Sequence, residues 1–251
     1  MTTDLVPVPD QPGAIVSAAQ QAQWLEDAGQ GLEQIGAKDI AIPFLGHVQG
    51  LSKQIVEGDP KFLPEARVGS LFNTVTGEVF DGKAGILVIV ADVQKVVAER
   101  EPKAAGGKFV AVFNTRKEAQ EQASPSNELV DGYRVFVLYQ TRQGTWTPAV
   151  LSMNTASKTY AMRNWNALLA GYRPGGIKFQ PPTYAAISRL TSSQMKNELG
   201  TFAVLKAEIV GSTPDEQYAQ AKYFRKALLA GAVKLGKDEE SEIVETEDAP
   251  F

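Results

Sequence analysis

The chain has 251 residues with 25 Lys and Arg, 29 Asp and Glu, no Cys and a single His, His47, and its net charge is −4. No Cys means no disulfide, thiolate metal site or Cys nucleophile, and one His disfavours a His-rich metal site or a Ser-His-Asp triad, so we expect no metal, no cofactor and no catalytic residue. No apolar run approaches the roughly 20 residues that cross a bilayer, and the N-terminus is unlike a secretory signal, so we expect no membrane contact and a cytoplasmic location.

The chain begins with a predicted N-terminal extension, residues 1–40, in which 1–12 are Pro-rich and 14–34 have helical composition interrupted by glycines. A single domain is predicted from 41 to 236. It starts with a short apolar segment at 40–45 and a helix-like segment at 48–56. Residues 69–82 predict a β-hairpin, because Thr76-Gly77 and Asp81-Gly82 supply turn residues between β-forming residues.

The middle of the chain predicts four strands. Residues 85–91 form the most apolar run and indicate a central strand, and 108–113 indicate another. The strands predicted at 133–141 and 146–153 form a hairpin. Within 133–141, Tyr133, Val135, Val137 and Tyr139 alternate with the residues of the opposite face, and at least one face must be core.

A helix is predicted at 156–169, where the Gly-rich segment 171–176 stops it, followed by strands at 184–190 and 202–210 joined by 192–200. The last helix starts at Thr213 with Pro214 in its first turn and runs to about Leu229. Strands and helices do not alternate regularly. This favours a mainly β fold with helices (α+β), specifically an OB-fold-like Greek-key barrel with helical extensions, over a doubly wound sheet.

The most informative internal feature is a stretch without acids. Residues 132–197 contain no Asp or Glu but eight Lys or Arg and nine aromatic residues. At ordinary composition 66 residues carry about seven or eight carboxylates. A groove for single-stranded nucleic acid needs this chemistry, because cations follow the phosphates, aromatic rings stack on unpaired bases and carboxylates repel the backbone.

From this stretch we select candidates for base stacking and phosphate contact. They are Arg134, Tyr139, Arg142, Trp146, Lys158, Tyr160, Arg163, Trp165, Tyr172, Arg173, Lys178 and Phe179. For each ring the alternative is a packing role in the core, and Trp165 can equally anchor its helix to the sheet.

The end of the chain predicts a disordered acidic tail at 237–251. From Asp238 onward it has seven acids and no base, so the remaining residues 1–237 carry a net charge of +3 (25 − 22). Such a segment cannot bury enough apolar surface to fold. Its Ala-Pro-Phe ending indicates a docking peptide rather than a segment that only maintains solubility. The candidate partner-binding residues are Glu245, Glu247, Asp248, Pro250 and Phe251.

With its tail ending Asp248-Ala-Pro-Phe251 and its strand–hairpin–helix block at 71–210, the chain resembles the OB-fold single-stranded DNA-binding proteins of bacteriophages. The segment 42–90, with Asn73-Thr-Val-Thr-Gly-Glu78, is also similar to uncharacterised phage proteins. The chain lacks the Gly/Gln/Pro-rich linker of the bacterial tetrameric proteins, so homo-oligomerisation stays open.

The resemblance implies a non-catalytic protein that coats single-stranded DNA in phage replication, recombination or repair. Its tail recruits a polymerase, helicase or nuclease. Alternatives are a strand-annealing recombinase and a phage structural or scaffold protein. A metal-dependent nuclease is a further alternative, since Asp92, Glu101 and Lys103 faintly match an Asp…Glu-x-Lys pattern. No GxxxxGK[ST] loop supports an ATP-driven function.

Overall fold

The computed structural model describes residues 42–105, 107–197 and 200–231. The chain divides into two compact units, Met1–Ile40 and Ala41–Phe251, and every described residue belongs to the second. The N-terminal extension, with its segment of helical composition at 14–34, and the predicted acidic tail therefore lie outside the described residues. Within the described part, no helix is long and apolar enough to cross a membrane.

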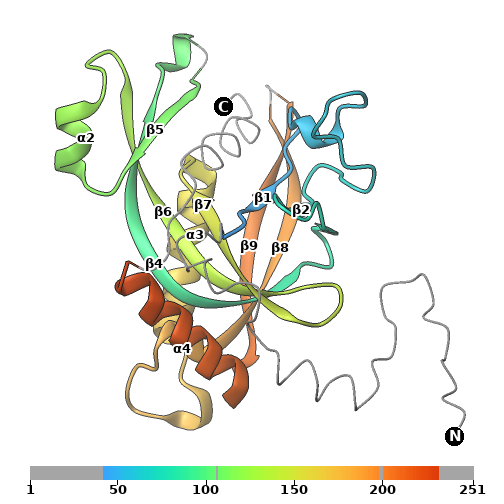
Figure 1. Cartoon of the computed structure of the whole chain (residues 1–251), viewed down its shortest axis with the longest axis vertical. Coiled ribbons are helices and arrows are strands. Elements are labelled where there is room, and N and C mark those ends of the chain that lie inside the picture. The colour runs from blue at the N-terminus through green and yellow to red at the C-terminus, as the bar shows by residue number, and fades with distance from the viewer. Residues whose placement is uncertain (1–41, 106, 198–199, 232–251) are drawn as a thin grey trace, which may run out of the picture. The chain divides into compact units, whose positions relative to one another are not determined.

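A large antiparallel sheet is the framework of the described unit (Figure 1). Its strands follow the order β7-β6-β4-β8-β9, and β5 also pairs with β4. The bounds are β4 Ile86–Arg100, β5 Phe109–Phe113, β6 Glu128–Gln140, β7 Trp146–Met153, β8 Ala186–Asn197 and β9 Gly200–Ser212. All six correspond to predicted strands, and β4, β6, β8 and β9 extend beyond the predicted ends.

Strand β4 is central, as predicted, because it has partners along both edges. One edge pairs with β6 over most of its length, and the other pairs with β8 at Ile86–Ile89 and with β5 at Val97–Arg100. The register with β6 shifts between Val90 and Asp92. Such a bulge bends a strand, and Figure 1 shows β4 as a strongly curved band. The predicted strand ended early because polar residues from Asp92 onward interrupt the apolar run.

The alternation predicted for β6 is confirmed, and both of its faces are buried. Val137 and Tyr139 pack in one core cluster together with Trp165, whereas Phe136 packs in a second cluster with Phe224. The sequence pattern requires only one buried face. The second face is buried because helix α4 (Asp215–Leu229) supplies Phe224 to it.

Two of the three helices in the described residues were predicted: α3 (Ala156–Gly171) and α4. The third, α2 (Arg116–Gln122), was missed. Thr115 Oγ1 accepts a hydrogen bond from Glu118 N at 3.1 Å, and Glu118 Oε2 accepts one from Asn114 N at 3.1 Å. This Thr-x-x-Glu spacing is a capping-box signal from which the helix start is predictable.

A smaller antiparallel sheet contains β1 (Leu45–His47), β2 (Leu71–Asn73) and β3 (Val79–Phe80). Strands β2 and β3 confirm the predicted hairpin at 69–82. Asn73 Oδ1 accepts hydrogen bonds from the amides of Val75 and Thr76, and Gly77 takes a positive φ of 69° that favours glycine.

The helix predicted at 48–56 is wrong, because this segment stays bonded to the small sheet and then turns. Val48 N donates to Ser70 O at 2.9 Å, and Gln49 N donates to Ser52 Oγ at 2.8 Å. Only one 3-10 turn follows, at Lys53–Ile55. Apolar spacing alone could not separate this irregular, half-buried segment from a helix.

The predicted fold class, mainly β with helices (α+β), is confirmed. The OB-fold barrel is not. Strands β7 and β9 end the path of the large sheet, and no pairing between them closes a barrel in the described residues. The fold is therefore an open, curved sheet with helices on its faces.

His47 is buried in a polar network that fixes its tautomer. Gln49 Oε1 accepts from Ala203 N at 2.9 Å, which orients the Gln49 amide so that Nε2 donates to His47 Nδ1 at 3.1 Å. His47 Nε2 then carries the hydrogen and donates to Ser192 Oγ at 2.8 Å. Burial, and to a lesser extent the positive charge of Lys158, lowers the pKa of His47 to about 3.

This depressed pKa predicts that the protein loses stability as the pH falls below 6.5. In that range the unfolded His47 binds a proton that the folded one does not, so the free energy of unfolding falls by about 1.4 kcal/mol per pH unit. Urea unfolding at pH 7 and pH 5 should show a loss of about 2 kcal/mol from this group. His47→Gln should remove that part of the pH dependence. An unchanged slope in the variant would assign the acid sensitivity to other groups.

Candidate nucleic-acid interface

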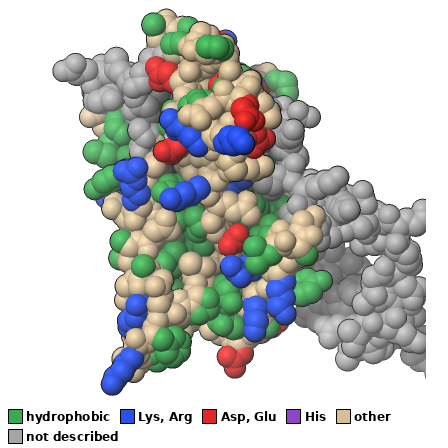
Figure 2. Space-filling view, turned by 90° about the vertical axis from the view of Figure 1, so that its left-hand side faces the viewer, with side chains coloured by type: hydrophobic (Ala, Val, Ile, Leu, Met, Phe, Trp, Pro, Cys, Tyr) green, Lys and Arg blue, Asp and Glu red, His purple; other side chains and the backbone are tan. Residues whose placement is uncertain are grey.

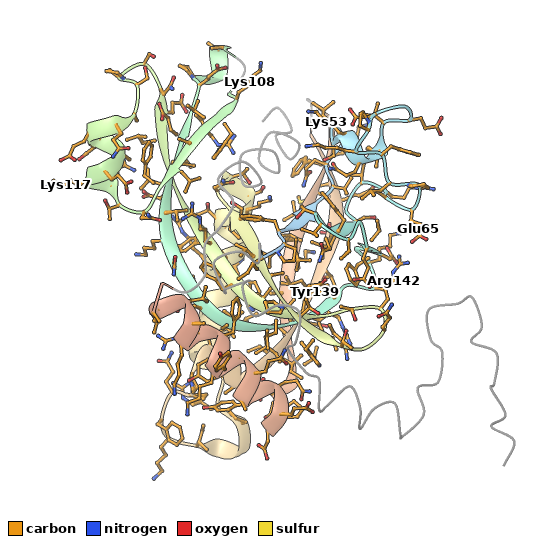
Figure 3. The ribbon with its side chains drawn as sticks, viewed as in Figure 1. Lys53, Glu65, Lys108, Lys117, Tyr139 and Arg142 are labelled. Carbon is orange, nitrogen blue, oxygen red and sulfur yellow. The ribbon has the colours of Figure 1, made fainter. Side chains whose placement is uncertain are left out.

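Tyr139, selected as a stacking candidate, lies in the core. It is 1% exposed, its hydroxyl accepts a hydrogen bond from Asn73 Nδ2 at 2.7 Å, and its ring packs edge-to-face on Phe80. Burial raises the pKa of its phenol. The ring has no face for a base, so Tyr139 is removed from the candidate surface (Figure 3).

Trp165 and Lys158 on α3 are also buried. Trp165 is 1% exposed and its Nε1 donates to Ser188 Oγ at 2.9 Å. Lys158 is 5% exposed and its Nζ donates to Ser152 O at 3.4 Å. Trp165 therefore anchors α3 to the sheet, which is the alternative weighed above, and Lys158 presents no ammonium group to a strand.

Arg142 is exposed, but acidic residues from another part of the chain surround it. Its guanidinium donates to Glu65 Oε2 at 2.6 Å, and its backbone N donates to Glu78 Oε1 at 2.7 Å. Figure 3 shows Arg142 and Glu65 together at one side of the unit. The stretch is free of acids in sequence but not in space, so Arg142 is a weak phosphate-contact candidate.

Two further candidates, Trp146 and Tyr172, are half-buried. Trp146 packs against the core cluster around Phe136, and its carbonyl accepts from Gln220. Tyr172 packs against the other cluster, and its hydroxyl forms a 2.7 Å hydrogen bond with Ser212 Oγ. Both rings therefore have a packing role that accounts for part of their surface.

The remaining candidates lie on the surface of α3 and of the loop after it. Tyr160 and Phe179 are 65% and 66% exposed, so neither ring has a packing role that explains it. Arg163 lies one turn after Tyr160 on the exposed side of α3, and Arg173 and Lys178 are exposed in the loop. Helix α3 itself contains no acidic residue. We call this set the α3 surface.

Arg173 and Arg134 also form hydrogen bonds within the fold. Arg173 donates to the carbonyls of Ala170 and Tyr172 at the end of α3, both at 2.7 Å. Arg134, half-buried on β6, donates to Asn114 Oδ1 at 2.9 Å. Figure 2 shows Lys and Arg side chains along much of one face of the molecule, with hydrophobic side chains and several Asp and Glu side chains between them.

A hollow of about 310 Å³ lies beside the α3 surface. The residues around it come from β4, β6, α3, the first residue of α2 and the segment just before α2. They are Lys95, Val96, Val97, Asn114, Arg116, Asp131, Gly132, Tyr133, Thr159 and Arg163. Of the predicted residues only Arg163 lines it. Lys95 and Arg116 were missed because they lie outside the acid-free stretch, and no local signal joins them to it.

The described residues give no support to the nuclease alternative. Asp92 Oδ1 lies 3.5 Å from Nε of Arg225 on α4, and the last eight residues of β4, roughly 30 Å along the strand, separate Asp92 from Glu101. In the part of the chain that the structure describes, no group of three or more His, Cys, Asp or Glu is arranged to hold a metal ion.

A family model described as Pam3 phage gp34-like protein matches residues 11–234. The chain belongs to this family. The prediction that this is a phage protein is thereby confirmed, and the match covers the described unit and part of the segment before it. Searches of curated proteins and of solved structures give no match. The candidate tail residues Glu245, Glu247, Asp248, Pro250 and Phe251 lie outside the described residues.

Proposed function

We propose that this member of the Pam3 phage gp34-like family is a non-catalytic single-stranded DNA-binding protein. It coats strands during phage replication or recombination and recruits partner proteins through its acidic tail. The observation that carries the proposal is the exposure of Tyr160 and Phe179, two rings in a stretch of the sequence that has no acids and that also contains the exposed Arg163 and Lys178. Exposed rings beside cations are available to stack on unpaired bases while the cations contact the phosphates.

Exposed rings between cations are suited to single strands rather than duplex. Bases stack on a ring only when they are unpaired, and each stacked base contributes about 1–3 kcal/mol. Cations contact the phosphates whatever the sequence, so we expect little base preference. Single-strand binding at the α3 surface does not depend on an OB-fold barrel, because its rings and cations lie on a helix and a loop.

The proposal predicts that Tyr160→Ala/Phe179→Ala weakens binding of a fluorescent oligo-dT by at least about 30-fold, since two stacking contacts are lost. Fluorescence anisotropy measures this. Tyr223→Ala is the matched control, because Tyr223 is 75% exposed on α4, outside the acid-free stretch.

Binding should also depend on salt, because each phosphate contact releases counterions. If the protein makes about four phosphate contacts, its affinity for oligo-dT should fall about 50-fold between 50 and 200 mM salt.

Three outcomes would contradict single-strand binding: a preference for duplex, an affinity independent of salt, or equal losses in the double variant and in Tyr223→Ala. A protein that binds no nucleic acid would favour the structural or scaffold alternative. The recombinase alternative needs annealing in addition to binding, and mixing complementary oligonucleotides with the protein tests it directly.

A further inference from the structure

The hollow lies where one face of the β4–β6 ladder is left uncovered between two helices. Met162 and Trp165 of α3 pack on this face near Val135, and Ala119 of α2 packs on it near Val97. The two helices meet different parts of the ladder, and the floor between them is exposed in the hollow.

Two register pairs form this floor. Lys95 lies opposite Tyr133, and Val97 lies opposite Asp131. Since alternate residues of a strand share a face, these four side chains belong to one surface. Thr159 and Arg163 of α3 border it on one side, and Arg116 of α2 borders it on the other. The site is therefore built on strands and helices and not on a loop.

The charges around the hollow favour an anion. Asp131 is the only acid among the lining residues, and its Oδ1 already accepts from Arg116 at 3.0 Å. Lys95 and Arg163 form no ion pair within the described ranges of the chain, and both are exposed. Two cations are thus left to face a ligand. The ring of Tyr133 lies beside them, half-buried: part of it packs against the core cluster that contains Val135, and part of it lines the hollow.

The volume sets the size of that ligand. Small-molecule sites start at about 300 Å³, so a hollow of about 310 Å³ takes one nucleotide rather than a run of stacked bases. A ring for the base and two cations for the phosphate match the two parts of a nucleotide. An acidic peptide would match the cations but would not use the part of the Tyr133 ring that lines the hollow.

We infer that the hollow binds a single nucleotide unit, with its phosphate facing Lys95 and Arg163 and its base against Tyr133. The inference rests on the proposed function, because the bound nucleotide is taken to be part of the single strand that the protein coats. Arg163 lies both at the hollow and on the α3 surface, one turn from Tyr160, so a strand that follows α3 reaches the hollow. The ion pair between Arg116 and Asp131 lies at the side of the hollow opposite α3.

The test is a titration of the ¹⁵N-labelled full chain with dTMP, followed by amide chemical shifts. Saturable shifts are expected at 95–97, 131–133 and 159–163. Lys95→Ala should weaken dTMP binding about tenfold, the loss typical of one charged contact. Lys117→Ala is the control, because Lys117 is 87% exposed on α2, outside the hollow, and pairs with Glu121.

Two further experiments measure the contributions of the phosphate and of the base to dTMP binding separately. Inorganic phosphate should shift the same cationic side of the hollow with lower affinity than dTMP. Tyr133→Leu, which keeps an apolar side chain, should remove the advantage of dTMP over phosphate. No shift with dTMP, equal effects of Lys95→Ala and Lys117→Ala, or an acidic peptide that binds the hollow more tightly than dTMP would overturn the inference.

Oligo-dT binding by the same variants separates the two proposals. If oligo-dT binds as proposed and the hollow does not respond to dTMP or to Lys95→Ala, the hollow inference is wrong and single-strand binding stands. If dTMP binds in the hollow and oligo-dT does not bind, the nucleotide site stands and the proposed function is wrong.

Discussion

Replacing Trp165 by Ala is expected to lower the free energy of unfolding by about 3–5 kcal/mol. The side chain is 1% exposed and belongs to the core cluster that joins α3 to the large sheet. Its removal leaves a cavity and also leaves the hydroxyl of Ser188, which is 0% exposed, without the indole as donor. Since domains are stable by only about 5–15 kcal/mol, this loss is a large share of the total.

Urea unfolding monitored by circular dichroism measures the effect. Trp165→Phe keeps most of the apolar volume and loses the hydrogen bond, so it should cost much less than Trp165→Ala. Leu168→Ala is a matched control on the same helix, because Leu168 is 43% exposed and its truncation leaves no buried cavity. If Trp165→Ala unfolds at the urea concentration of Leu168→Ala, the indole does not anchor α3.

The sequence predicted the elements well where periodicity and turn chemistry agree. The hairpins β2–β3 and β6–β7, the central strand and helices α3 and α4 all follow from local patterns. The closed barrel did not follow, because barrel closure depends on pairing between strands far apart in the chain, and β7 and β9 carry no local signal for or against it. The number of predicted strands is compatible with an OB-fold but does not show whether the strands close into a barrel.

The candidate site was predictable only in part, because the residue type does not show whether an aromatic ring is buried in the core or exposed on the surface. Trp165 and Tyr160 lie five residues apart on α3, yet one is fully buried and the other 65% exposed. The helix turns 100° per residue, so five positions place them on opposite sides. The sequence indicates a candidate region, and the packing of α3 against the sheet decides which of its rings are exposed.

The cationic residues of the candidate site were also predictable only in part. Arg142 and Arg189 come from a stretch without acids, but Glu65 and Glu208 reach them from other segments at 2.6 and 3.1 Å. Conversely, Lys95 lies outside that stretch and is brought to Arg163 by the β4–β6 ladder and α3. Counting charges along a chain indicates the kind of ligand, whereas the pairing of charges in space indicates which cations are left for it.

The acidic tail should separate partner recruitment from DNA binding. Phe251→Ala is expected to weaken capture of a replication or recombination partner by about 30-fold, because truncating an aromatic anchor in a pocket costs about 2 kcal/mol or more. It should leave the affinity for oligo-dT unchanged. Ile243→Ala is the matched control, since it removes an apolar side chain from the same tail away from its end.

Deleting residues 238–251 removes seven negative charges as well as the anchor. Affinity for oligo-dT should then stay the same or rise, most at low salt, where the Debye length is longest and the acids act on the basic surface from a distance. Pull-downs from infected-cell lysate with full-length, Phe251→Ala, Ile243→Ala and tail-deleted protein measure recruitment, and anisotropy of the same four proteins measures DNA binding. Under the proposed function the aromatic ring would act through contact and the acids through long-range charge, so only the deletion is expected to change both measurements. Recovery of the same polymerase, helicase or nuclease by all four proteins would show that the tail does not recruit it.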